Sequence, residues 1–190
     1  MELIEIQQQL QTFTGRFPRQ ALQAAIAHKE EMTPWLLQVV REMHQQAAAL
    51  LDQPQAMAHM YAPYLLAQFR ETQTYPLLVE FFSLPGEITL DVTGDMVTED
   101  LSRILASVCG GDTHLITHLV KEPTANEYVR NAALEALVCL VACGVQARES
   151  VVAYYGSGES SSRPFMPPNM TFLRMWQSAQ PQNSPQPIAT

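Results

Sequence analysis

The sequence has little charge, and positive charge is the scarcer kind. Charged residues make up 16% of its 190 residues, the net charge is −8, and the only lysines are Lys29 and Lys121. The arginines are scattered along the chain, so no basic stripe is available to neutralise phosphate groups. We therefore expect no binding to nucleic acid and no attachment to an anionic membrane surface.

Long apolar runs are missing as well. The longest lies within residues 132–142, is interrupted by Glu135 and falls far short of the ~20 residues that a membrane span needs. The first eleven residues hold glutamates and several glutamines where a signal peptide has an apolar stretch. Three cysteines without a secretory signal fit a reducing compartment. The sequence thus predicts a cytoplasmic protein.

Catalytic and cofactor motifs are also absent. There is no phosphate-binding P-loop, no glycine-rich dinucleotide fingerprint, no zincin motif and no nucleophile elbow. We therefore predict no cofactor, and no residue is assigned a catalytic role.

Helical periodicity is what the chain does contain. Apolar residues recur at helical spacing in residues 33–51, and Thr33 is predicted to cap this helix with Pro34 at its first position. The same spacing returns in residues 97–108, 115–120 and 129–141. Only Ile88–Val92 is a plausible extended piece. The pattern predicts an all-α fold.

Proline, glycine and capping residues divide these helices into pairs. Pro63 is expected to kink or restart its helix, and Thr124 with Glu127 has the spacing of a capping box. Three pairs follow, at about residues 55–84, 97–121 and 126–155, with starts spaced as in helical solenoids. Each pair is too small to bury its apolar face alone, so stacking must complete the core.

Two resemblances support this interpretation. Residues 126–137 resemble the second helix of a HEAT repeat, with Asn126, the pair Val129-Arg130 and small residues where helices approach closely. Residues 61–71, 94–112 and 126–130 resemble an uncharacterised bacterial family, a domain of unknown function thought to be HEAT-like. The resemblance implies a short right-handed α-α superhelix over about residues 1–155. Many members continue into a cysteine-rich zinc-binding tail, whereas here no cysteine follows Cys143.

Polar residues near predicted helix ends are the candidates for partner binding. Arg130 could recognise a carboxylate or phosphate, but a structural pair with Asp112 or Asp95 is the favoured interpretation. The other candidates in the helical region share a place at or near a helix end. They are Gln68, Arg70, Glu99 and Asn126.

Two pairs of residues have metal-ligand spacing. His114 and His118 lie four apart on one predicted helix face, as do Cys139 and Cys143. The histidines lack a third ligand within reach, and the cysteines have apolar neighbours and are expected to be small buried hydrophobes. We predict no metal site.

The segment 156–190 differs in composition from the rest. A Gly/Ser-rich linker precedes prolines, and between them residues 169–179 form an apolar island containing Trp176. This island could fold back on its own chain, or dock on a second copy or a partner. Trp176 is therefore a further candidate for partner binding.

The expected function is that of a scaffold, because stacked helix pairs present an extended surface that usually binds proteins or peptides. An enzyme or small-molecule-binding accessory protein with a pocket on the helical surface is the alternative. The partner itself cannot be read from the sequence.

Overall fold

The computed structural model describes residues 1–156. The expected tail lies outside the described residues. Trp176 and residues 169–179 belong to this tail. Their predicted docking and self-association therefore also fall outside the described residues.

The described part of the chain is all helical, with twelve helices and two isolated β-bridges but no strand. This confirms the all-α prediction. None of these helices is both long and apolar enough to cross a lipid bilayer. The helices are α1 (Leu3–Gln11), α2 (Arg19–Ala27), α3 (Lys29–Gln45), α4 (Ala47–Leu51), α5 (Ala58–Phe69), α6 (Thr74–Phe82), α7 (Ile88–Thr93), α8 (Met96–Glu99), α9 (Leu101–Val108), α10 (His114–Lys121), α11 (Glu127–Ala142) and α12 (Arg148–Gly156).

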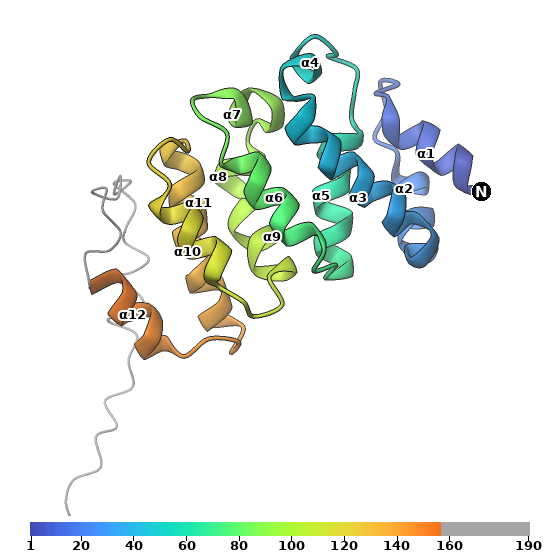
Figure 1. Ribbon diagram of the computed structural model, residues 1–190. Coiled ribbons are helices and arrows are strands. Elements are labelled where there is room, and N and C mark those ends of the chain that lie inside the picture. Colours follow the sequence, from blue (N-terminus) through green and yellow to red (C-terminus); the bar gives the residue numbers. More distant parts are fainter. Residues whose placement is uncertain (157–190) are drawn as a thin grey trace, which may run out of the picture.

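The longer helices form two rows. α3, α6 and α10 contact one another in that order, and behind them α5, α9 and α11 do the same (Figure 1). Across the rows, α3 packs on α5, α6 on α9 and α10 on α11. Helices α1 and α2 pack on each other at the N-terminal end, and α12 packs on α11 at the other end.

This pairing differs from the one expected. α10 was grouped with α9, but it packs chiefly on α11. The reason is that two short helices, α7 and α8, carry the chain from one row to the other between α6 and α9.

Large apolar side chains from both rows form one continuous core. Leu66, Leu78, Leu101 and Leu105 are fully buried, as are Phe81 and Phe82. The two phenylalanine rings meet edge to face with centroids 4.9 Å apart, an arrangement favoured by the ring quadrupoles.

Polar links join helices both across the two rows and within each row. Lys29 Nζ donates to the carbonyl of Phe69, 40 residues away, and Ser107 Oγ donates to the carbonyl of Ala67, also 40 away. The amide of Ile116 donates to Tyr75 Oη across 41 residues. An isolated bridge joins residues 85 and 125. Each of these links therefore joins segments that lie about 40 residues apart in the chain.

Two predictions based on proline are wrong. Thr33 does not cap a helix, because α3 begins earlier, at Lys29, and Pro34 lies inside it. Met32 is buried together with Leu36, so the apolar face already extends upstream of the proline. Pro63 lies inside α5, buried in the core, so the helix does not restart there, while a kink at Pro63 stays a prediction.

Two local predictions are wrong for other reasons. Ile88–Val92 is helical, and the buried residues of α7 are Thr89, Val92 and Thr93, which is helical spacing. The predicted capping box at Thr124 does not start α11, whose N-cap is Asn126.

Candidate functional site

An open groove of about 730 Å³ lies near the N-terminal end of the stack. It lies between the outer face of α3 and the segment that leads into α5. Its apolar lining consists of Trp35, Val39, Met43, Leu50 and Pro54 with small alanines. Five glutamines also line it, namely Gln11, Gln38, Gln46, Gln53 and Gln55.

Local structure explains both walls. On α3 the lining residues follow helical spacing from Trp35 to Gln46, so they form one stripe along the helix. The other wall is extended backbone, where the amide of Phe13 donates to Gln55 at 2.8 Å and that of Met57 donates to Gln11 at 2.9 Å. These bonds make an isolated antiparallel bridge that joins the two segments of this wall.

Glu42 is the one acidic residue that lines the groove, and no lysine or arginine lines it. Gln38 Nε2 donates to Glu42 Oε1 at 2.7 Å, and Arg41 donates to Gln38 Oε1 at 2.8 Å. The Gln38 amide thus orients the Glu42 carboxylate, while Arg41 binds the Gln38 amide.

His59, in the first turn of α5, also lines the groove. It is only 8% exposed, and burial lowers the pKa of its ring, partly offset by a hydrogen bond to the backbone of Val92. Its Nδ1 has no hydrogen-bond partner among the described residues. A neutral ring that donates from Nε2 to Val92 leaves Nδ1 as a buried acceptor.

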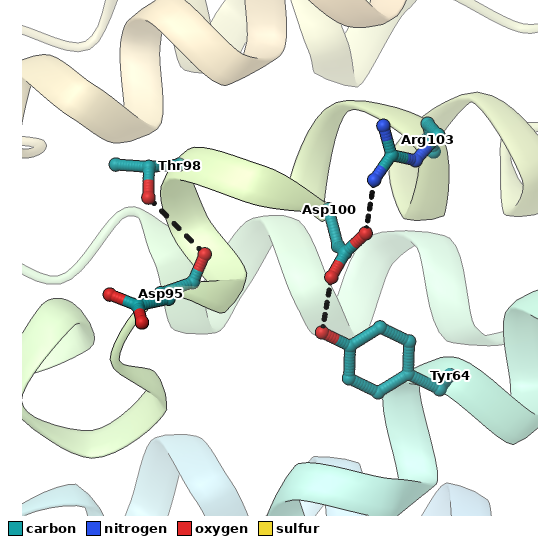
Figure 2. A network of polar contacts seen from close by, with 5 residues as sticks. All are labelled: Tyr64, Asp95, Thr98, Asp100 and Arg103. Atoms are coloured by element: carbon teal, nitrogen blue, oxygen red, sulfur yellow. Dashed lines mark hydrogen bonds and ion pairs between the residues drawn. The ribbon is translucent and has the colours of Figure 1, made fainter.

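A second, smaller hollow of about 490 Å³ lies where α5, α7 and α8 meet, and it is lined by Asp91, Asp95, Glu99 and Asp100. Figure 2 shows Tyr64 reaching from α5 to donate to Asp100 Oδ2 at 2.7 Å, with Arg103 paired to the other oxygen. The bond from Tyr64, and secondarily Arg103, hold the pKa of Asp100 below its ordinary value of 3.8.

Replacing Tyr64 with phenylalanine is expected to lower the free energy of unfolding by about 0.5–1 kcal/mol at neutral pH, since a partly exposed bond to a carboxylate is lost. The lowered pKa of Asp100 means that this stabilisation is complete above pH 3.8 and disappears as the pH falls through the folded-state value. Urea unfolding of the unaltered protein and of Tyr64→Phe over a pH series measures the difference in the free energy of unfolding. A difference that stays constant down to the lowest pH would contradict this role of the bond.

Within residues 1–156, the residues predicted to bind a partner do not line the groove. Gln68 and Arg70 are exposed at the C-terminal end of α5, where Arg70 adopts a left-handed conformation with φ of 55°. Glu99 is exposed and lines the acidic hollow. Arg130 is half-buried on α11, and its pairing with Asp95 or Asp112 stays a prediction.

Asn126 is the N-cap of α11, one turn before Arg130, and is buried. It accepts from the amide of Tyr128 at 2.9 Å and donates to the carbonyl of Gly86 and to Glu87 Oε1. The side chain therefore caps α11 and fastens it to the loop after α6.

The pairs with metal-ligand spacing are placed as follows. His114 and His118 are exposed on α10, Cys139 is half-buried and Cys143 is exposed. Burial raises the pKa of the Cys139 thiol, which disfavours the reactive thiolate. In residues 1–156 no three His, Cys, Asp or Glu side chains come together as a set that could hold a metal ion.

The fold and the groove define an all-helical protein of stacked helices with an open, amide-lined groove on its surface. The chain belongs to a family of proteins of unknown function, DUF1186, whose sequence profile matches residues 1–160.

Two relatives are similar over most of this chain. Uncharacterized proteins of Chlamydia trachomatis serovar D and of Chlamydia muridarum are each 42% identical to it over 156 residues. The aligned region covers 82% of this chain but only 62% of each relative. No solved structure matches the chain significantly.

Proposed function

We propose that the chain is a peptide-binding scaffold built from HEAT-like helical repeats. Support for the repeats comes from the polar links and the bridge that recur at about 40 residues. A cytoplasmic location is supported by the three cysteines, which are free thiols.

The lining of the groove is the observation that carries this proposal. A glutamine side chain offers both a donor and an acceptor, as does each unit of a peptide backbone. Five such side chains beside a stripe of apolar residues match an extended segment, whose backbone seeks hydrogen bonds while its side chains seek apolar contact. Because the groove is partly open to solvent, a segment of a longer chain could enter it.

Selection from a random dodecapeptide phage library tests the proposal. We expect the protein to enrich peptides that bind in the micromolar range. The double variant Gln38→Ala, Gln46→Ala should weaken them about tenfold or more, since two hydrogen bonds of about 1 kcal/mol each are lost. Titration calorimetry with synthetic copies of the enriched peptides measures the change.

The matched control is Gln20→Ala, Gln23→Ala, which removes two exposed amides of α2 that do not line the groove. Its affinity should equal that of the unaltered protein. Absence of any enriched peptide, or equal weakening by both double variants, would argue against the groove as the binding site.

A further inference from the structure

We infer that the groove selects an extended peptide segment that carries a lysine or arginine side chain, which pairs with Glu42. This inference rests on the proposed function and adds the chemistry of the partner. It depends on two separate features of the groove, the carboxylate of Glu42 and the buried imidazole of His59.

The charge balance of the lining favours a basic segment. Glu42 is half-buried, it is the only acidic residue that lines the groove, and no cationic side chain lines it. The bond from Gln38 engages Oε1, so Oε2 retains capacity to accept from a ligand. A partly buried ion pair with a ligand is screened less than one at the open surface. An acidic segment would instead be repelled, and the net charge of −8 adds to that repulsion.

The opposite wall adds no positive charge that would oppose a basic segment. His59 is more than nine-tenths buried, and burial lowers the pKa of its ring, which favours the neutral form. Its Nδ1 is shielded by the surrounding protein. Met57, the N-cap of α5, makes no side-chain cap bond, which leaves the first backbone amides of this helix able to donate to a peptide carbonyl.

An apolar side chain beside Glu42 suits the stem of a long basic side chain. Val39 is half-buried, lines the groove and lies one turn before Glu42 on α3. The methylene groups of lysine or arginine can pack there while the charged end reaches the carboxylate. A short cation, such as a free amine, would lack this contact.

Three pools of capped dodecapeptides test the inference, with the central residue fixed as lysine, norleucine or glutamate and the rest randomised over neutral residues. The full chain is expected to bind the lysine pool at least tenfold more tightly than the norleucine pool, and the glutamate pool least. In Glu42→Gln the lysine and norleucine pools should bind alike, because the amide keeps the bond to Gln38 but carries no charge.

The control is Glu30→Gln, which changes the net charge equally in the first turn of α3 but does not line the groove. It should retain the preference for lysine. Equal binding of the lysine and norleucine pools by the unaltered protein would overturn the inference and leave the proposed function standing. Loss of the preference in Glu30→Gln would also overturn it, by assigning the preference to overall charge. If no pool bound, the proposed function would fail, and the inference with it.

Discussion

Replacement of Asn126 with alanine is expected to lower the free energy of unfolding by about 2–3 kcal/mol. The amide caps α11 through the backbone of Tyr128, and loss of such a cap costs about 1 kcal/mol. It also donates to the carbonyl of Gly86 and to Glu87, which fasten the loop after α6 to the start of α11. Because the site is buried, alanine leaves these acceptors without their donor, at further cost.

Asn131→Ala is the matched control for this prediction. The Asn131 amide donates to Glu135 one turn further along the same helix, at an exposed position, so its loss should cost no more than about 0.5 kcal/mol. Urea unfolding followed by circular dichroism measures both variants. Similar small effects in the two would show that Asn126 does not fasten α11 to the loop after α6, and lost partner binding at unchanged stability would assign it to a binding surface.

Replacement of Tyr75 with phenylalanine is expected to destabilise the fold by about 1.5–3 kcal/mol, although only one oxygen is removed. The hydroxyl accepts from the amide of Ile116 at 2.7 Å, in the first turn of α10 where backbone donors lack partners within the helix. Both groups are buried, so water cannot replace the lost acceptor. The unsatisfied amide carries most of the expected cost.

The control for Tyr75 is Tyr61→Phe. The Tyr61 ring contacts Phe17, and its hydroxyl makes no hydrogen bond with the described residues. The expected change is within about 0.5 kcal/mol, as for a surface substitution. If thermal unfolding placed the two variants at the same midpoint, the link between α6 and α10 through Tyr75 would be unimportant for stability.

The spacing of apolar residues was sufficient to predict the all-α fold, because a helix that buries one face has apolar residues every three or four positions. Helix boundaries were predicted less well. Pro34 and Pro63 were given too much weight, since a buried apolar face on both sides of a proline can keep a helix continuous. The short helix α7 was missed because six residues are too few to separate helical from extended spacing.

The groove could not be predicted from the sequence. Its walls come from α3 and from backbone near residues 12 and 56, which are brought together by an isolated bridge that has no local signal. Trp35, Gln38 and Glu42 lie at helical spacing beside the buried face of α3, which was the only available hint. The polar residues singled out near helix ends are instead spread over α5, α8 and α11 within the described part of the chain.

If the groove beside α3 is the peptide-binding surface, its side chains should respond when a peptide is added. Nuclear magnetic resonance of the labelled protein, titrated with a selected lysine-containing peptide, measures this response. A Trp176→Phe background leaves Trp35 as the single indole signal. We expect the signals of the Trp35 indole and of the side-chain amides of Gln38 and Gln46 to shift, while those of Gln20 and Gln23 stay in place. Shifts confined to the surroundings of Arg70, Glu99 and Arg130, with the groove signals unmoved, would contradict it.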